Sequence, residues 1–397
     1  MLHKVCFLTN DNLYNSKRHF TQSLSQSLEG LGVETRIIDL EEKSLGTAEI
    51  QMIHDWSPDF TCSFSSIDPL LDESFFWDTL KIPHLYILVD PAIFNLQYIK
   101  SPYAAISCTD KFDCEFLKRA KFDRTFFMPH AVDKKYLEEP LNEDRPYDVV
   151  LVGSCYDHQQ LREAWKKHLS TQECDILEEA IDCHLSESHT HFTEALLKAI
   201  NHSNVDPSKL NMIELAVYLD HYTRGKDRVE LVRAIKDAHV HLFGHLFWDE
   251  EMRKGDWNHY FGDQVNVTIH EGVPYEETFD IYKKSKIALN STPFFRNGSH
   301  ERVFNCLAMG CSVITSENRF LRDQFSTGKG VKYYLSNDRA QVNESINAWL
   351  DNEELRKKEM LEGRSLVKDH HTWDHRAWQL LDMMPKLTQK ITYFELQ

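Results

Sequence analysis

Short apolar runs alternate with amphipathic segments from the first residues of the chain. Phe20, Leu24 and Leu28 recur at helical spacing, which predicts a helix over residues 16–31. The apolar runs on either side predict two strands, and the short connections make this unit typical of a parallel sheet. The same rhythm continues and predicts strands at 3–10, 34–40, 60–64, 85–89, 104–108 and 125–128.

A polar, proline-punctuated segment at 129–148 interrupts this rhythm and predicts a linker. We therefore expect an N-terminal domain over 1–140 and a C-terminal domain over 147–370. The second domain is predicted to contain strands at 148–152, 240–242, 265–269, 287–289, 312–315 and 331–334.

The segment at about 157–238 is helical in pattern almost throughout, and it is too long for a simple crossover. It predicts a helical insertion in the second domain. A final helical segment follows over 371–397. The predicted fold class is α/β, with two doubly wound Rossmann-like domains that face a cleft at the carboxyl ends of their strands.

Residues 285–318 carry the strongest functional signal. They are predicted to form a strand, a polar loop, a helix and a second strand. Ser299 stands at the expected helix N-cap, and Gly310 stands where a left-handed glycine ends a helix. A helix that starts in a Gly/Ser loop between two strands is how α/β proteins bind an anionic ligand.

Composition restricts the functional classes. A net charge of −17 over 397 residues argues against nonspecific binding to nucleic acid or to an anionic membrane. No signal peptide and no apolar run of about 18 residues is found, so we expect no transmembrane segment. The nine scattered cysteines lack metal-site spacing and favour reduced, mostly buried thiols in the cytoplasm.

The motif N-S-T-P-x-F-x-x-G-S-H-E-R-V-F-N-x-x-A-x-G, at 290–310, resembles the donor-binding segment of GT-B glycosyltransferases. It is most similar to the CgeB-like and group 1 families. The order of strands and helices over roughly 148–381 agrees with this resemblance, whereas residues 1–140 share only the general layout. The resemblance implies that the segment 371–397 crosses back to the N-terminal domain.

The resemblance further implies transfer of a sugar from a nucleoside-diphosphate donor, with UDP or GDP as the nucleotide, to a glycan, lipid-linked or protein acceptor. It implies no cofactor and no required metal, and the chain contains no Asp-x-Asp motif. Arg302 and His300 would then stabilise the departing diphosphate, and Glu301 would contact hydroxyls of the donor sugar. Asn305 stands where related enzymes often carry a ribose-binding Glu, a role that Glu301 could take instead.

Two loops are expected to bring backbone amides to a phosphate. Asn297, Gly298 and Ser299 lead into the predicted helix, and Gly153 and Ser154 end the first strand of the second domain. All five residues would also serve as ordinary loop and turn residues.

A catalytic base would have to come from the N-terminal domain. Asp90 and His130 are the candidates there, because each follows a predicted strand. Asp before Pro91 is also a common turn former, and a lone histidine is usually structural.

Other interpretations remain open at this stage. The same fold would serve a nucleotide-sugar epimerase or hydrolase, or a two-domain protein that binds a ligand without catalysis. His239, His241 and His245 suggest a metal at first sight, but their alternation fits half-buried strand positions better, so no metal site is predicted.

Overall fold

The computed structural model of the chain describes residues 2–10, 12, 14–41, 45–64, 66–70, 73–244, 256–326 and 328–394. It divides into two compact units. The first comprises Met1–Lys135, Pro274–Glu276 and Asp369–Gln397, and the second comprises Tyr136–Val273 and Glu277–Lys368.

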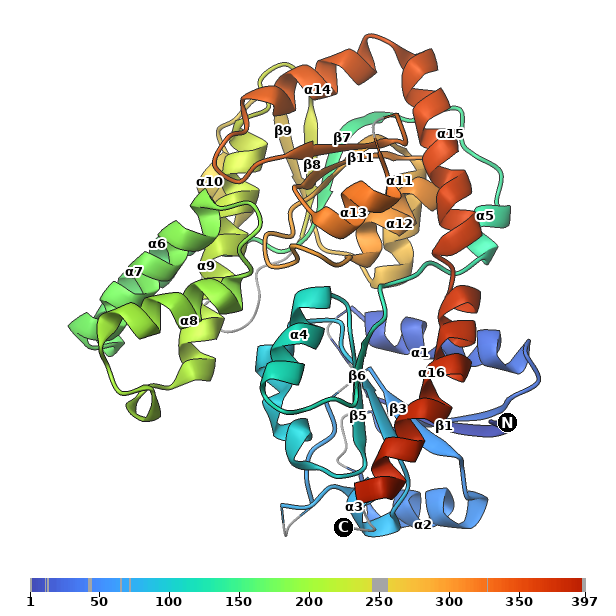
Figure 1. Cartoon of the computed structure of the whole chain (residues 1–397). Helices are drawn as coiled ribbons and strands as arrows, with labels where there is room; N and C mark the ends of the chain where they lie inside the picture. Colours follow the sequence, from blue (N-terminus) through green and yellow to red (C-terminus); the bar gives the residue numbers. More distant parts are fainter. Residues whose placement is uncertain are drawn as a thin grey trace. The chain divides into compact units, whose positions relative to one another are not determined.

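The first unit is built on a parallel six-stranded sheet in the order β2-β1-β3-β4-β5-β6 (Figure 1). Its strands are β1 (Lys4–Thr9), β2 (Glu34–Asp39), β3 (Phe60–Ser63), β4 (His84–Ile87), β5 (Ala104–Cys108) and β6 (Thr125–Phe127). Its helices are α1 (Ser16–Glu29), α2 (Thr47–Trp56), α3 (Phe76–Leu80), the 3₁₀ helix η1 (Ala92–Lys100), α4 (Lys111–Arg119) and α16 (Trp373–Phe394). The single-turn helix α5 (Lys135–Glu138) follows along the chain.

The last helix of the chain, α16, packs against α1 inside this unit. Val132 and Thr372 form a parallel bridge just before it begins. The buried Arg376 donates a hydrogen bond to the Pro129 carbonyl at 2.7 Å, and burial lowers the pKa of its guanidinium to about 9. Buried hydrogen bonds thus connect residues 247 and 246 positions apart in the sequence.

The second unit contains another parallel six-stranded sheet, in the order β12-β11-β10-β7-β8-β9. Its strands are β7 (Tyr147–Val152), β8 (Val240–Phe243), β9 (Val267–His270), β10 (Ser285–Asn290), β11 (Ser312–Ser316) and β12 (Val331–Tyr334). Beyond the insertion, its helices are α10 (Trp257–Phe261), α11 (Thr278–Lys283), α12 (Glu301–Ala308), α13 (Arg319–Gln324), α14 (Ala340–Leu350) and α15 (Glu353–His370). The 3₁₀ helix η3 (Tyr275–Glu277) begins in the first unit, to which Tyr275 and Glu276 belong.

The segment between β7 and β8 is helical. It consists of α6 (His158–His168), α7 (Thr171–Ser186), α8 (Phe192–Ser203), the 3₁₀ helix η2 (Pro207–Lys209) and α9 (Met212–Arg233). Figure 1 shows these helices as a bundle beside the second sheet. Trp165, Leu177, Leu196 and Leu219 are fully buried within it, so the bundle has its own apolar core.

These observations confirm the predicted α/β class with two doubly wound sheets. The prediction for β9 was wrong at its start, because the strand begins at Val267 and Val265 is 97% exposed. The Asn266 side chain donates to the Ala238 carbonyl at 3.1 Å, and this contact holds the chain in a turn before the strand.

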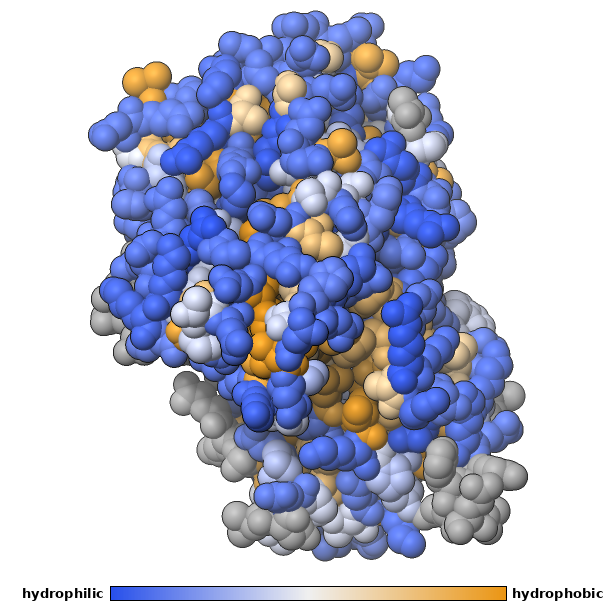
Figure 2. Space-filling model, turned by 60° about the vertical axis from the view of Figure 1, so that its left-hand side comes forward, coloured by the Kyte–Doolittle hydropathy of each residue, from blue (hydrophilic) through white to orange (hydrophobic). Residues whose placement is uncertain are grey.

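The surface is strongly polar. Most of the face in Figure 2 is hydrophilic. Across the described ranges, no helix combines the length and hydropathy needed to span a membrane. All nine cysteines are free thiols, and only Cys174 and Cys183 are partly exposed.

Candidate functional site

The order of strands in the second sheet reverses between β7 and β10. From β7 the sheet grows through β8 and β9 on one side, and then through β10, β11 and β12 on the other. The loops after β7 and β10 start at Gly153 and Ser291, at the carboxyl ends of paired parallel strands. Open parallel sheets bind their ligands at such a reversal. The predicted donor-binding residues lie in these two loops and in helix α12, which follows the second loop.

Helix α12 starts one residue later than the sequence predicts, so the assignment of Ser299 as N-cap was wrong. The N-cap is His300, whose backbone is extended and whose imidazole Nδ1 accepts a hydrogen bond from the Arg302 amide at 3.3 Å. An imidazole nitrogen thus satisfies the amide that a hydroxyl was expected to satisfy. Gly310 has a φ of +77° after the helix, as predicted.

His300 and Glu301, two of the predicted catalytic residues, lie side by side at the start of α12. His300 Nδ1 is 2.9 Å from Glu301 Oε2, and both side chains are partly exposed. The same Nδ1 is the acceptor of the helix cap. The position of one proton therefore decides whether this nitrogen accepts from the helix or donates to the carboxylate.

Arg302 is almost completely buried in the first turn of α12. Its guanidinium donates to Asn290 Oδ1 at 2.7 Å. Asn290 in turn donates to Thr315 Oγ1 at 2.9 Å, which fixes the orientation of its amide. Among the described residues, no carboxylate forms an ion pair with Arg302. A buried guanidinium with a neutral partner retains a charge that an anionic ligand can compensate.

Arg228, on helix α9, is a candidate site residue that no pattern in the sequence predicts. It is 6% exposed, and its guanidinium donates to the Ser154 carbonyl at 2.6 Å. A Cβ at Gly153 would lie 3.4 Å from the Arg228 guanidinium carbon, so the two are in contact across the loop. The neighbouring Asp227 is paired with Arg339 at 2.6 Å. Within the described ranges, Arg228 has no carboxylate partner either.

The positive charges of this region act on one another. Burial, together with the charges of Arg302 and Arg224, lowers the pKa of Arg228 to about 10. Mutual repulsion of this kind is expected where a site is built to hold an anion. One signal in the sequence pointed here, since Gly225 interrupts a helical pattern. A Cβ at Gly225 would overlap the Tyr156 carbonyl, so the glycine permits α9 to approach the loop after β7.

The remaining predicted donor residues surround this region in the sequence but differ in exposure. Gly298 and Ser299 are buried immediately before α12, and Asn297 is half-buried. Asn305 is 1% exposed on the second turn of α12, and Ser154 is 8% exposed after β7. The structure thus gathers these residues in two loops and one helix of a single unit.

Comparison with protein families gives a match over residues 226–382 to the family described as "Glycosyl transferase-like". Solved structures match over nearly the whole chain. A glycosyltransferase from Rickettsia africae has a TM-score of 0.58 at 10% identity, and the match covers 98% of this chain and 99% of that chain. The chain has the GT-B fold of these glycosyltransferases.

Two further solved structures share the GT-B fold with this chain. A sucrose-phosphate synthase from Thermosynechococcus elongatus has a TM-score of 0.58 at 10% identity, covering 98% of this chain and 99% of that chain. Anabaena Alr3699/HepE in complex with UDP-glucose has a TM-score of 0.53 at 8% identity, and the match covers 96% of this chain and 99% of that chain. No curated protein sequence gives a significant match.

The two candidate bases lie in the first unit of the chain. Asp90 is exposed shortly after β4. His130 is 3% exposed after β6, its carbonyl accepts from Arg376 at 3.1 Å, and its ring meets the Phe20 ring edge-on at 6.2 Å. Asp90 therefore faces solvent, whereas His130 is a buried group in an aromatic environment.

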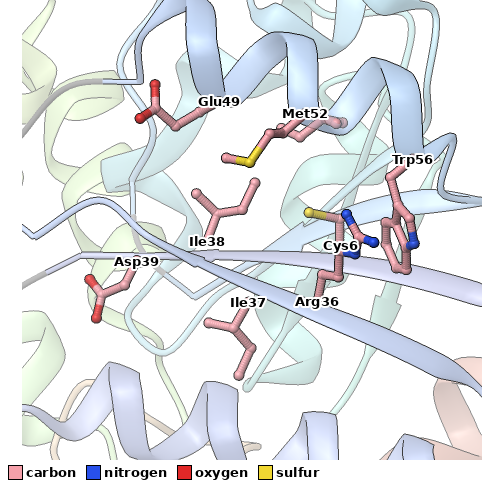
Figure 3. Close-up of a pocket in the computed structure, with 9 residues that line it drawn as sticks. Cys6, Arg36, Ile37, Ile38, Asp39, Glu49, Met52 and Trp56 are labelled. Carbon is pink, nitrogen blue, oxygen red and sulfur yellow. The ribbon is translucent and has the colours of Figure 1, made fainter.

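A pocket of about 370 Å³ lies elsewhere in the first unit, between β2 and α2. Figure 3 shows Met52 and Glu49 on α2 above Ile38 of the strand. The charged Asp39 at its edge already binds Arg18 at 2.7 Å, a hydrogen bond that lowers the pKa of the Asp39 carboxyl. The pocket is lined by the carboxyl-terminal part of β2, from Arg36 to Asp39, and contains none of the predicted site residues.

The histidines of β8 and β9 form a polar cluster on the second sheet. His241 Nδ1 lies 3.0 Å from His270 Nε2, and His239 Nε2 lies 2.8 Å from Thr268 Oγ1. Burial lowers the pKa of His241 to about 4, so its ring is neutral at ordinary pH. In the part of the chain that the structure describes, no group of three potential ligands has metal-binding geometry. His245 lies outside the described residues.

Proposed function

We propose that the chain is a glycosyltransferase that transfers a sugar from a UDP-sugar donor, or alternatively a GDP-sugar, to a glycan, lipid-linked or protein acceptor in the cytoplasm. The observation that carries the proposal is the pair of buried guanidinium groups, Arg228 and Arg302, without carboxylate partners in the described chain. They flank the strand reversal where an α/β sheet binds its ligand. UDP-glucose bound to the structurally similar HepE supports the choice of UDP.

The chemistry requires stabilisation of a leaving group. When the bond between the sugar and the diphosphate breaks, negative charge develops on the diphosphate oxygens. Arg228 and Arg302 are placed to bind that charge, and the positive end of the α12 dipole adds to their effect. Cations that are already buried and oriented need no reorganisation during the reaction, and the mechanism we propose therefore uses neither a cofactor nor a required metal.

The other residues take the roles that the resemblance implies. Glu301 would accept hydrogen bonds from hydroxyls of the donor sugar, and its neighbour His300, 2.9 Å away, would hold that carboxylate in place. Asn305 would contact the ribose, and the amides of Gly298 and Ser299 would bind a phosphate. For the acceptor, Asp90 or His130 of the first unit would supply the base.

A thermal-shift screen tests this proposal. UDP, GDP, TDP and CMP would each be added to the wild-type protein and to the variants Arg302→Ala and Glu301→Ala. A nucleoside diphosphate at 100 times its Kd should stabilise the wild type by about 2.7 kcal/mol through mass action, and Arg302→Ala should lose this effect. No shift with any nucleotide, or full shifts in both variants, would refute the proposed site.

A further inference from the structure

One face of helix α9 contacts both loops of the proposed donor site. Arg224, Asp227 and Arg228 are spaced three and four residues apart, so they project from the same side of the helix. The helix belongs to the insertion between β7 and β8. The insertion is therefore in direct contact with the loops at the strand reversal.

Two of these residues hold the loop that follows β10. The Arg224 guanidinium lies over the Phe294 ring at 3.6 Å, and it also donates to Asp220 at 2.7 Å. Asp227 accepts a hydrogen bond from Ser291 Oγ at 2.6 Å. Phe294 and Ser291 are both buried, so these contacts are sheltered from water and fix the first half of the loop.

The third residue holds the loop that follows β7. Arg228 donates to the Ser154 carbonyl, and Gly225 allows the helix backbone to lie against Tyr156. The same turn of α9 is thus in contact with both loops. Its length and side chains set the spacing between them.

A second contact from the insertion secures the far part of the β10 loop. Arg296 is 3% exposed, and its guanidinium donates to the His184 carbonyl at the end of α7 at 2.8 Å. On the other side, the Arg296 carbonyl accepts from the Arg319 amide at 2.9 Å. The loop that leads into α12 is therefore held between the insertion and α13.

We propose that the helical insertion is a positioning element for the donor diphosphate, with Arg224 and Arg296 as positioning residues that keep the β10 loop at a fixed distance from Gly153 and Ser154. The inference rests on the proposed function, because it concerns the same anion site. A loop held in its binding conformation before the ligand arrives avoids the entropy cost of ordering on binding. The insertion would raise affinity for the diphosphate and leave affinity for the nucleoside unchanged.

Isothermal titration calorimetry with UDP and with uridine tests the inference. Arg224→Lys keeps a cation beside Asp220 but removes the planar group that stacks on Phe294. Arg296→Met removes the contact with His184. The control is Arg233→Met, because Arg233 is exposed and lies on α9, the same helix as Arg224. We expect UDP to bind about tenfold more weakly to Arg224→Lys and to Arg296→Met than to the wild type, and we expect the affinity for uridine to be the same in all four proteins.

The ratio of the two affinities separates positioning from general stability. Partial unfolding of a variant would lower the titration stoichiometry and reduce binding of both ligands together. The inference would be overturned if the affinities for UDP and uridine fell equally, or if Arg224→Lys and Arg296→Met both bound UDP as tightly as the wild type. If the wild-type protein itself bound no UDP, the UDP-dependent function proposed above would fail, and the role of the insertion with it.

Discussion

Substitution of Arg228 by methionine should weaken donor binding without weakening the fold. The guanidinium is 6% exposed and donates to a backbone carbonyl, with no carboxylate partner in the described chain. A hydrogen bond from a charged group to a diphosphate oxygen is worth about 1.5–3 kcal/mol. Its loss corresponds to a UDP dissociation constant about 10- to 150-fold higher.

The same substitution removes an uncompensated buried charge from the free protein. Burial lowers the pKa of Arg228 to about 10, which reflects the cost of keeping its charge there. Replacement of buried charges by apolar groups of similar volume is often neutral or stabilising. We therefore expect Arg228→Met to melt at the wild-type temperature or above it when no ligand is present, although the contact with Ser154 is lost.

Calorimetric titration with UDP and a thermal melt of the free protein measure the two effects. Arg233→Met provides the matched control, because it lies on the same helix with an exposed side chain over the Tyr260 ring at 5.7 Å. The control should retain wild-type affinity and stability. Affinity within about twofold of wild type in Arg228→Met would refute the assignment of this residue to the diphosphate site.

Three further predictions follow from single contacts. Burial lowers the pKa of His84 to about 3, so the folded state excludes a proton that the unfolded state binds below pH 6.5. The free energy of unfolding should therefore fall as the pH decreases, by about 2 kcal/mol at pH 5 for this residue. Urea titrations of His84→Gln should show a weaker pH dependence than those of the wild type. Gly310→Ala should destabilise the fold by about 2–3 kcal/mol in the same titrations, because φ is +77° there and a Cβ would overlap the Arg145 guanidinium. Donor turnover should be unchanged by EDTA, since Arg228 and Arg302 are proposed to replace a metal; loss of turnover that Mg²⁺ or Mn²⁺ restores would contradict this role.

The sequence predicts the fold well because each element carries a local signal. Apolar runs end in glycine or polar residues at β7 and β10, and the buried residues Val303, Phe304 and Leu307 show the helical spacing of α12. The cap of α12 was misplaced by one residue, because serine is the commoner cap and histidine rarely serves. Only the side-chain hydrogen bond identifies the true cap.

The candidate site is less accessible from sequence. Arg228 and Ser154 are 74 residues apart, and no local pattern reports that their groups meet. Arg296 likewise looks like a loop arginine until its contact with His184, 112 residues away, is known. The one local signal is Gly225, a glycine inside a helical pattern, which is consistent with the close approach of α9 to the loop after β7. Long-range polar contacts of this kind depend on tertiary packing, which periodicity does not encode.

Release of nucleoside diphosphate from a sugar donor is the most direct test of a donor site at Arg302. Wild-type protein and Arg302→Ala would be incubated with UDP- and GDP-sugars without acceptor, and the released UDP or GDP would be followed in a coupled assay. We expect slow release from at least one donor, reduced about 100-fold or more in the variant. No release from any donor, or equal release by both proteins, would contradict a donor site built around Arg302.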